Sequence, residues 1–534
     1  MASKLAPQTH PSSPMLSTTS TVQHPAKPPL LLGTRATRIT TSFITVCAIA
    51  FPAALSKLLA HPYLDGVSFP LCIMCISALS LLIVCICITY RRARPPPCYL
   101  VDFCCTVGNK SYAASADNFG RFLRSWKSVK LANLKFQFKV FVKSGVGEEA
   151  RAPVRLFERG EDTDMQDARD ESEDLILDAA RKVLQKTGVD AKEIDIIIVN
   201  SSLFNPVPSL TAYLVHELKL RSNVKSFNLA GMGCSAGLIA IDLAVQLLRV
   251  HRNSNALVIS TENITKNMYF GNDRSMMVSN CLFRCGCCAS LLTNKPGKVH
   301  LRPKMKLLHL FRTNLAADQK AYDCVQHMED EEGRLGVSLK ISLLEVAGVA
   351  LRANITRLAP YILPWTELIK VGASIAKKKV LKKSGQVYSP DFKKAIDHFC
   401  IHPGGRAVLN EIGMGLKLED YDVEPGRMAL ERFGNTSSSG IWFALAYCEA
   451  KGRLKRGGTV WQIALGSGFK CNSAVWRLLR DVDAQENMES NPWSSCIKDF
   501  PISSAAVEQR AVRFREVYSK LFEDKGQDED QTIG

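Results

Sequence analysis

The sequence predicts a layered α/β fold between about residues 98 and 476, preceded by two membrane-spanning helices. Three observations predict this arrangement. Strand-like apolar runs alternate with helix-like segments, glycine turns follow several of the runs, and two long apolar stretches come before them. Alternating strands and helices are typical of α/β domains. An apolar stretch of about 20 residues is long enough to cross the hydrocarbon core of a bilayer.

Five apolar runs have the length and composition of β-strands. They are IDIIIVN (194–200), SFNLAG (226–231), ALVISTE (256–262), HFCIH (398–402) and VWQIALG (460–466). Helical patterns lie between them, for example at 174–187 and 236–250. The charged segment 145–170 is interpreted as a surface excursion. The charged tail 502–534 shows only a weak helical pattern.

The predicted transmembrane hairpin occupies residues 39–90, as two apolar stretches joined by the link HPYLDGVS. The second stretch has no charged residue, whereas the first contains Pro52 and Lys57. Arginines flank the hairpin on both sides and the link has no Lys or Arg, so the positive-inside rule places both outer ends in the cytosol. Residues 1–38, rich in Ser, Thr and Pro, are then a disordered cytosolic tail, with an organellar transit peptide as the alternative.

Charge and cysteine content limit the classes of partner. The formal net charge of +17 favours a polyanion: nucleic acid, an anionic membrane face, or a phosphorylated substrate such as coenzyme A. No nucleic-acid motif accompanies the charge, so nucleic acid is not expected as a partner. The 18 cysteines are not spaced like a secreted disulfide framework. They predict buried, reduced thiols in a protein that faces the cytosol.

The most informative stretch, NLAGMGCSAG, places Cys234 between a predicted strand and a predicted helix. Gly231 and Gly233 form a tight turn just before it. In the helix that follows, Asp242, Gln246 and Arg249 form one narrow polar stripe, so the rest of that helix is expected to be buried. Backbone N–H groups and the helix dipole at this position would lower the pKa of a thiol and favour a thiolate nucleophile. A buried structural cysteine is the alternative.

Further candidate site residues lie at the ends of other predicted elements. His402 ends a predicted strand and precedes a Pro-Gly-Gly turn, which suits a site because ligands of α/β sheets gather at the carboxyl ends of strands. Asn435 lies in a Gly- and Ser-rich turn, where helix capping is the simpler role. The backbone N–H groups of another turn are predicted to bind a developing oxyanion: Gly466, Ser467 and Gly468. The order Cys, His, Asn also occurs in papain-like proteases, whose sequence motif is missing around the cysteine.

Taken together, these stretches resemble the plant 3-ketoacyl-CoA synthases, the condensing enzymes of very-long-chain fatty acid elongation. The resemblance runs from the hairpin to about Pro501. Its motifs include YLVDF, SGVGEE, NLAGMGCSAG, STENIT, YFGNDRSM, DHFCIHPGGRAV, RFGNTSSSGIW, VWQIALGSGFKCNSAVW and NPWSSCI. It implies a thiolase-like, five-layered α-β-α-β-α core of two similar halves. The first half, 91–385, would carry Cys234, and the second, 386–501, would carry His402 and Asn435.

The resemblance also implies the activity. Cys234 would accept a long-chain acyl group from acyl-CoA, and decarboxylation of malonyl-CoA would supply the carbanion, giving 3-ketoacyl-CoA, CO2 and CoA. His402 and Asn435 would stabilise the enolate. No cofactor or metal is expected. The implied location is the endoplasmic reticulum membrane, with the catalytic domain facing the cytosol. The implied partners are membrane lipid, other elongase subunits and a second copy of the chain.

Three positions depart from the family pattern. Asn314 and Glu431 stand where the family usually has His, and Pro403 replaces a usual Ala beside His402. The histidine that the family has in its Asp-His-Phe motif is present here as His398. The departures leave open an inactive member that regulates the elongase complex. A type III polyketide synthase would share the Cys-His-Asn set but would lack the hairpin.

The cysteine-rich stretch RCGCC suggests a metal site only superficially. It contains Cys285, Cys287 and Cys288, with Cys281 upstream. Structural zinc sites space paired ligands by two to four residues and add a second pair elsewhere. The spacing fits that pattern poorly, so no metal is expected here.

Overall fold

The computed structural model describes residues 77, 79–81, 83, 95–108, 111–295, 302–381, 388–483 and 490–522. The chain divides into two units, Met1–Ala93 and Arg94–Gly534. The predicted tail and nearly all of the predicted hairpin lie outside the described residues. A search of the described helices finds none that is both long enough and apolar enough to cross a bilayer.

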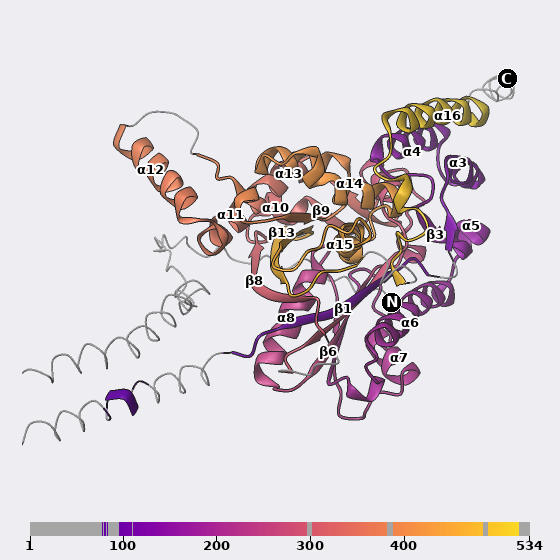
Figure 1. Cartoon of the computed structure of the whole chain (residues 1–534). Helices are drawn as coiled ribbons and strands as arrows, with labels where there is room; N and C mark the ends of the chain where they lie inside the picture. The colour runs from indigo at the N-terminus through magenta and orange to yellow at the C-terminus, as the bar shows by residue number, and fades with distance from the viewer. Residues whose placement is uncertain are drawn as a thin grey trace, which may run out of the picture. The chain divides into compact units, whose positions relative to one another are not determined.

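A nine-stranded sheet forms the centre of the second unit, in the order β11-β12-β13-β8-β1-β7-β6-β4-β5 (Figure 1). Its strands are β1 Tyr99–Thr106, β4 Ile196–Asn200, β5 Lys225–Leu229, β6 Asn255–Thr261, β7 Cys287–Thr293, β8 Met305–Asn314, β11 His398–Ile401, β12 Thr459–Gly466 and β13 Lys470–Leu478. Strand β4 pairs in parallel with β5 and β6, and β11 pairs in parallel with β12. All five strands predicted from the sequence are therefore confirmed. Two short antiparallel pairs stand apart: β2 Ser111–Ala113 with β3 Arg151–Pro153, and β9 Val325–Glu329 with β10 Leu335–Leu339.

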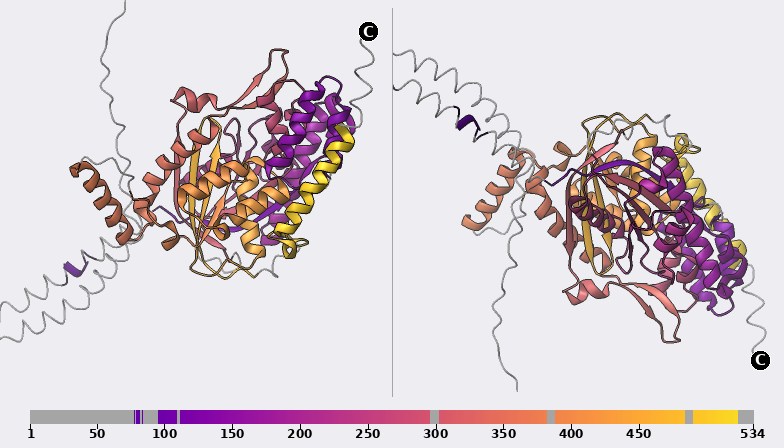
Figure 2. Two further views of the ribbon diagram at one scale, coloured as in Figure 1. Left: turned by 90° about the horizontal axis from the view of Figure 1, so that it is seen from above. Right: turned by 90° about the horizontal axis from the view of Figure 1, so that it is seen from below.

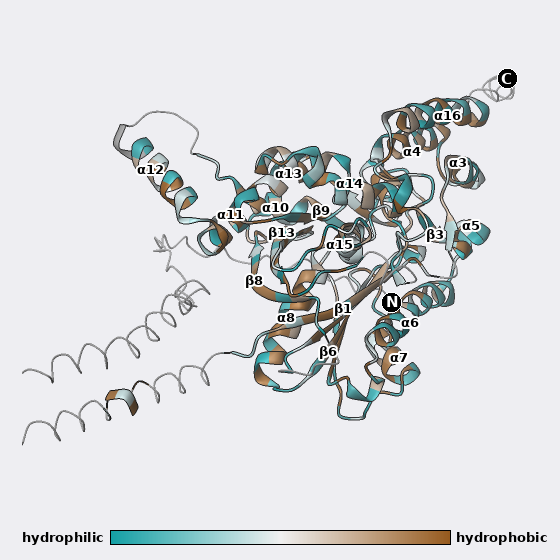
Figure 3. Ribbon diagram, viewed as in Figure 1, coloured by the Kyte–Doolittle hydropathy of each residue, from teal (hydrophilic) through white to brown (hydrophobic). Residues whose placement is uncertain are grey.

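Helices cover both faces of the sheet (Figures 1 and 2). They are α3 Ala116–Ser125, α4 Leu131–Ser144, α5 Val154–Arg159, α6 Met165–Thr187, α7 Leu210–Glu217, α8 Ala236–Val250, α9 Arg274–Leu282, α10 Gln319–Asp323, α11 Leu343–Ile362, α12 Trp365–Leu381, α13 Arg406–Leu416, α14 Asp420–Phe433, α15 Gly440–Ala450 and α16 Ser504–Phe522. Helices α8 and α15 share one apolar core with β1, β6, β11 and β12. Helix α15 is apolar on all sides, as expected of a helix inside a protein. Figure 3 shows apolar residues concentrated on α8 and the central strands.

The polar stripe predicted on α8 is confirmed. Gln246 and Arg249 are exposed and Asp242 is half-buried, while most of the other residues of the helix are buried. The stripe is linked by hydrogen bonds, with Gln246 donating to Asp242 over 3.4 Å and Arg249 donating to Gln246 over 3.2 Å. Helix α8 is thus held inside the core by its apolar surface and meets water along one edge.

The prediction of a surface excursion at 145–170 is wrong in part. The segment contains β3, α5 and the start of α6, and Leu156 is fully buried. Its charges misled the prediction because two of them build a helix start. The Asp164 carboxylate accepts a hydrogen bond from the Asp167 N–H, and the Asp167 carboxylate accepts one from the Asp164 N–H. This capping box begins α6 well before the predicted helix at 174–187.

The charged C-terminal tail contributes a helix to the folded unit. Helix α16 packs against α3 and α4 and buries Phe514, Val517 and Phe522. Arg510 of α16 forms an ion pair with Glu431 of α14, and both side chains are mostly buried. The weak helical pattern in the tail therefore corresponds to a helix that packs against the folded unit.

Strand β8 lies on the N-terminal side of the predicted division between residues 385 and 386. It pairs with β13 along its whole length, from Met305 to Asn314. With β1 it shares only two residue pairs, Tyr99 with Lys306 and Leu100 with Met305. Strand pairing therefore groups β8 with the C-terminal strands of the sheet.

The ion pair between α14 and α16 yields a stability prediction. Arg510→Ala leaves the buried Glu431 carboxylate without its partner, and we expect the free energy of unfolding to fall by about 1–3 kcal/mol. Arg513→Ala on the same helix removes a half-exposed guanidinium and should cost at most about 1 kcal/mol. Thermal or urea unfolding of the full chain in detergent, followed by circular dichroism, measures both. An equal loss in the two variants would contradict a special role for Arg510.

Candidate active site around Cys234

Cys234 lies in a tight turn between β5 and α8, as the sequence predicts. Gly231 and Gly233 have φ values of +64° and +69°, in the left-handed region that glycine adopts without strain. The Ala236 N–H donates to the Gly233 carbonyl over 2.9 Å, which closes the turn directly around the cysteine. The thiol is therefore held at the first turn of a buried helix.

This turn touches the turn at the end of β12, and glycines make the contact possible. A Cβ atom on Gly233 would lie 2.4 Å from the Ser467 Oγ. A Cβ atom on Gly466 would lie 2.6 Å from the Ser235 backbone N. One on Gly237 would lie 2.4 Å from the carbonyl oxygen of Ser438. Side chains at Gly233 or Gly466 would force the two turns apart, whereas a side chain at Gly237 would collide with the separate turn Ser437–Ser439.

His402 and Asn435 are held by backbone hydrogen bonds from neighbouring elements. The His402 N–H donates to the Ile463 carbonyl of β12 over 2.9 Å, which fixes the residue just beyond β11. The Asn435 N–H donates to the Leu282 carbonyl at the end of α9 over 2.9 Å. The Asn435 Oδ1 accepts from the Ser437 N–H over 2.9 Å. Asn435 thus closes a local turn rather than capping helix α15, whose N-cap is Ser439, and it also lines the cavity.

A cavity of about 930 Å³ brings the predicted residues together. Cys234, His402 and Asn435 all line it, with Gly466 and Ser467 beside them, and Gly468 follows in the same turn. Apolar side chains from α4, α9, β9, β10 and α11 form much of its wall: Phe136, Val140, Val278, Leu282, Phe283, Val325, Val337, Leu339, Ile341, Leu343, Leu344 and Ala347. The site joins a thiol, an imidazole and an amide to a long apolar chamber.

Three of the predicted secondary residues lie outside this cavity. His398 begins β11, and four residues of strand, on the order of 13 Å, separate it from His402. Asn314 ends β8 in an exposed position, where its Oδ1 accepts from the Ala316 N–H over 3.0 Å. Neither of them lines the cavity. The interpretation of these two residues as part of the site is not supported by their positions.

Glu431 is the third of these residues. Two possible partners were expected, Arg432 and Arg427, or else exposure to solvent. Instead its carboxylate pairs with Arg510 of α16. Burial raises the pKa of Glu431, and Arg510 opposes that shift. Its partner could not be foreseen because it comes from a helix 79 residues away in the chain.

Burial controls the protonation of the candidate nucleophile and its partner. Burial raises the pKa of Cys234 to about 12, and the Glu262 carboxylate raises it further, whereas hydrogen bonds from Ser437 and Asn435 act in the opposite direction. Burial lowers the pKa of His402 to about 4. The prediction of a resting thiolate is therefore wrong, because removal from water outweighs the helix start. Cys234 as a neutral thiol and His402 as a neutral imidazole therefore line the same cavity.

Sequence reasoning missed Glu262. This buried carboxylate follows β6 and accepts hydrogen bonds from the Ser202 and Leu203 N–H groups, each over 3.0 Å. The Ser437 hydroxyl lies between this carboxylate and the thiol, 3.2 Å from the Glu262 Oε2 and 3.8 Å from the Cys234 Sγ. Burial raises the pKa of Glu262. The signal was present in the STENIT motif, which served only as a mark of resemblance.

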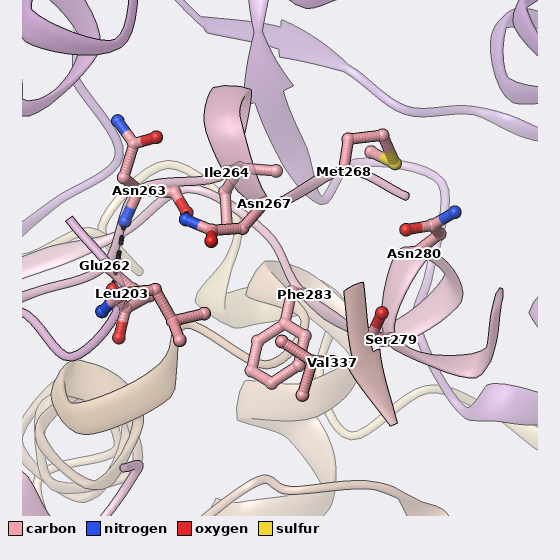
Figure 4. Close-up of a pocket in the computed structure, with 10 residues that line it drawn as sticks. All are labelled: Leu203, Glu262, Asn263, Ile264, Asn267, Met268, Ser279, Asn280, Phe283 and Val337. Atoms are coloured by element: carbon pink, nitrogen blue, oxygen red, sulfur yellow. Dashed lines mark hydrogen bonds between the residues drawn. The ribbon is translucent and has the colours of Figure 1, made fainter. Parts of the chain in front are cut away.

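Glu262 also lines a second, much smaller cavity of about 20 Å³. Figure 4 shows Glu262 and Leu203 at one end of it and Met268 and Asn280 at the other. Phe283 lines both cavities. The carboxylate therefore stands in the wall between the large chamber and this inner void.

The cysteine-rich stretch is built into the sheet. Cys287 and Cys288 are successive residues of β7, so their side chains point to opposite faces. Both are buried free thiols, as is Cys285. Within the described ranges, no cluster of three or more His, Cys, Asp or Glu side chains is placed to hold a metal ion.

Comparison with family models covers most of the chain. Residues 89–380 match the model described as FAE1/Type III polyketide synthase-like protein. Residues 392–478 match the model described as 3-oxoacyl-acyl-carrier-protein (ACP) synthase III C terminal. The first of these matches alone spans more than half of the chain.

Curated relatives agree with the family models. The chain is 49% identical to 3-ketoacyl-CoA synthase 9 of Arabidopsis thaliana over 77% of this chain and 80% of that protein. It is 48% identical to 3-ketoacyl-CoA synthase 17 of the same plant, over 78% and 85%. It is also 48% identical to probable 3-ketoacyl-CoA synthase 20 of Oryza sativa subsp. japonica, over 78% and 79%.

Solved structures share the fold at low sequence identity. CsyB in complex with CoA-SH aligns with a TM-score of 0.57 and 19% identity, over 71% of this chain and all of that one. The C-terminal type III polyketide synthase domain of Steely1 from Dictyostelium aligns with a TM-score of 0.57 and 17% identity, over 72% and 99%. At this identity the likeness speaks for the fold alone, and that fold is not a papain-like one.

A thiolase-like fold whose central cavity collects a cysteine, a histidine and an asparagine defines a condensing acyltransferase. The relatives then make the assignment specific, because they are nearly half identical over more than three quarters of the chain. This chain belongs to the 3-ketoacyl-CoA synthase family.

The contact between the two turns yields a prediction with a matched control. Gly233→Ala and Gly231→Ala both place a side chain at a positive φ, but only the Gly233 position meets atoms within 4 Å. We expect Gly233→Ala to slow acylation of the cysteine by ~100-fold or more, because misplacement of reacting groups by about 1 Å costs that much. Gly231→Ala should stay within a few-fold of wild type. Rates of acyl-enzyme formation, followed by mass spectrometry, measure both. Similar rates in the two variants would contradict the steric argument.

Proposed function

We propose that this chain condenses a long-chain acyl-CoA with malonyl-CoA to give 3-ketoacyl-CoA, CO2 and CoA. The observation that carries the proposal is the shared cavity. Cys234, His402 and Asn435 all line it, together with apolar side chains from five elements. Each buried CH2 group contributes about 0.8 kcal/mol, so such a wall suits a long acyl chain.

In the first half-reaction the Cys234 sulfur bonds to the acyl carbonyl carbon and the C–S bond to CoA breaks. The thiol proton must leave as the sulfur attacks, because burial keeps the resting thiol neutral. We assign this proton to neutral His402, which lines the cavity and would return it to the CoA sulfur. Backbone N–H groups of the Cys234 turn and of the 466–468 turn would stabilise the tetrahedral oxyanion.

In the second half-reaction malonyl-CoA loses CO2, and the resulting enolate carbon attacks the acyl carbonyl carbon. The new C–C bond forms as the bond to the Cys234 sulfur breaks. The His402 imidazole and the Asn435 amide can both donate hydrogen bonds to the thioester oxygen on which the enolate charge develops. A buried, neutral histidine suits this role because it adds a donor without adding charge.

Cations at the same cavity would bind the phosphates of coenzyme A. Four basic side chains are among its lining residues: Lys139, Lys143, Lys340 and Arg406. All four are exposed to solvent, whereas Glu262, the one carboxylate in the lining, is buried. We infer that the phosphates bind at the exposed rim and the thioester reaches inward to Cys234.

The family departures do not argue for a regulator. Asn314 is bonded to the nearby Ala316 N–H and Glu431 to Arg510 of α16, and neither residue lines the cavity. Pro403 packs beside Gly440, where a Cβ would lie 2.7 Å from the Pro403 ring. We therefore propose that the chain is an active synthase and that Glu431 fastens α16 to the fold.

The remaining proposals concern organisation. We propose a five-layered core with α8 and α15 in its middle layer, built from halves 91–385 and 386–501, with β8 donated to the sheet of the second half. A transmembrane hairpin at 39–90 would hold the chain in the endoplasmic reticulum membrane, with the catalytic unit in the cytosol. The hydropathy and arginine distribution of the sequence support this. A homodimer and contacts with other elongase subunits complete the proposal.

Condensation with labelled malonyl-CoA across a range of acyl-CoA lengths tests the assignment. Wild-type chain in microsomes should form labelled 3-ketoacyl product, and Cys234→Ala should form none above background. Cys288→Ala, which alters a buried thiol of β7, should retain activity within a few-fold. Product from Cys234→Ala at the wild-type level would defeat the proposed nucleophile. Equal background from all three proteins would favour the regulator.

The pH dependence of thiol alkylation tests the proposed protonation state. Because the pKa of Cys234 is raised to about 12, its thiolate fraction grows throughout the range between pH 7 and 10. Alkylation of Cys234 should rise about tenfold per pH unit without a plateau. A plateau near pH 7 would show a resting thiolate and contradict the assignment.

The same assay isolates the contribution of Glu262. Glu262→Gln removes a carboxylate that disfavours the thiolate, so the pKa of Cys234 should fall and alkylation at pH 9 should accelerate, by about tenfold for each unit of decrease. Glu171→Gln is the matched control, since Glu171 is also buried but lies outside the cavity lining. Acceleration in the control alone would contradict the role given to Glu262.

A further inference from the structure

Helix α12 exposes its apolar face. Trp365 and Ile369 are each 67% exposed, and Gly372, Ala373 and Ala376 are also exposed. The spacing i, i+4, i+7, i+8 and i+11 places all five on one side of the helix. Figures 1 and 2 show α12 projecting from the body of the unit just after α11.

The opposite face of α12 carries its buried polar contacts. The Glu367 carboxylate is fully buried and accepts hydrogen bonds from Lys394 over 2.6 Å, from the Tyr388 hydroxyl over 2.8 Å and from the Asp391 N–H over 3.1 Å. The Ser374 hydroxyl accepts from the Tyr388 N–H over 2.8 Å. Residues 388–394 thus cover the polar face of α12 and hold it by hydrogen bonds. Leu368 packs against the apolar core, so α12 is covered on one side while its Trp365 side stays exposed.

Apart from Glu367, the charged residues of α12 are all positive. Lys370, Lys377 and Lys378 are exposed, and Lys370 also contacts Glu367. Glu367 is the one acidic residue of the helix, and lysines neutralise it. The sequence continues through the end of the helix as AKKKVLKK. An apolar stripe with an aromatic residue at its start and a lysine cluster at its end is complementary to an anionic lipid surface.

We propose that α12 is an interfacial helix that lies on an anionic membrane surface, with Trp365 and Ile369 inserted below the headgroups and the lysines against them. A protein partner fits less well, because lysine is depleted in protein interfaces. Tryptophan, in contrast, is enriched at the boundary between headgroups and acyl chains. This contact involves none of the residues given to catalysis, and it is separate from the hairpin.

The chain carries its own reporter for this contact. It has six tryptophans, and Trp365 is exposed whereas the other five are at most 5% exposed: Trp126, Trp442, Trp461, Trp476 and Trp493. The difference between the emission of wild type and of Trp365→Phe therefore isolates one side chain. The full chain would be reconstituted in vesicles of phosphatidylcholine and phosphatidylserine whose acyl chains are brominated near the headgroups.

The expected result is quenching of the Trp365 emission by brominated lipid and its protection from iodide in the water. The quenching should be several-fold weaker in vesicles without phosphatidylserine. Emission that iodide quenches and brominated lipid leaves unchanged would overturn the proposal. It would also be the outcome if a protein partner, absent from the vesicles, normally covers this face.

Charge reversal separates the lysines from the apolar stripe. Lys377→Glu with Lys378→Glu should reduce brominated-lipid quenching several-fold in the phosphatidylserine vesicles. Lys192→Glu with Lys225→Glu reverses the same charge on exposed lysines near the edge strand β5 and should leave the quenching unchanged. Equal quenching in both double variants would overturn the electrostatic part of the proposal. Condensation activity at the wild-type level in each variant would show that the fold is intact.

Discussion

The close approach of two backbone turns is the constraint on which the rest of the site depends. The turn before α8 and the turn after β12 touch because Gly233 and Gly466 have no side chains to separate them. The first turn carries Cys234 and the second carries the N–H groups proposed to hold an oxyanion. Both turns end strands of the same sheet, so the contact also sets where the apolar cavity can begin. A methyl group at Gly233 or Gly466 would push the two turns apart, and it would thereby move both the thiol and the backbone N–H groups proposed to bind the oxyanion.

The second determinant is exclusion of water. The same packing that joins the turns leaves His402 buried and Cys234 half-buried, and each is neutral at rest because burial disfavours its charged form. Glu262 acts on the thiol through space and through the Ser437 hydroxyl. The cations stand at the exposed rim, where coenzyme A phosphates can stay hydrated. The positive charges thus lie at the exposed rim of the cavity, and the reacting bonds lie in a region of low dielectric. Hydrogen bonds to a developing oxyanion are strong in such a region.

Two peripheral helices show how local charge can mislead. Glu431 takes the position of a usual family histidine, yet its carboxylate serves α16 through Arg510. Helix α12 hides its single carboxylate and shows its tryptophan to the outside. In both cases a segment outside the helix supplies partners for the carboxylate, so the pattern within the helix does not reveal which face is covered.

The sequence by itself determined five of the nine strands of the central sheet, the buried helix α8 and the placement of Cys234, His402 and Asn435 at turns. Strand composition, the 3.6-residue periodicity and glycine at positive φ act over a few neighbouring residues. The many separate motifs in one order also identified the family. Only the tertiary structure decided the rest: that β8 pairs with β13, that Arg510 neutralises Glu431, that Glu262 faces the thiol, and that Cys234 is a neutral thiol. Strand pairing, ion pairing and burial depend on groups that lie tens to hundreds of residues apart in the chain. The burial of a side chain, and hence the shift of its pKa, is set only when the chain has folded.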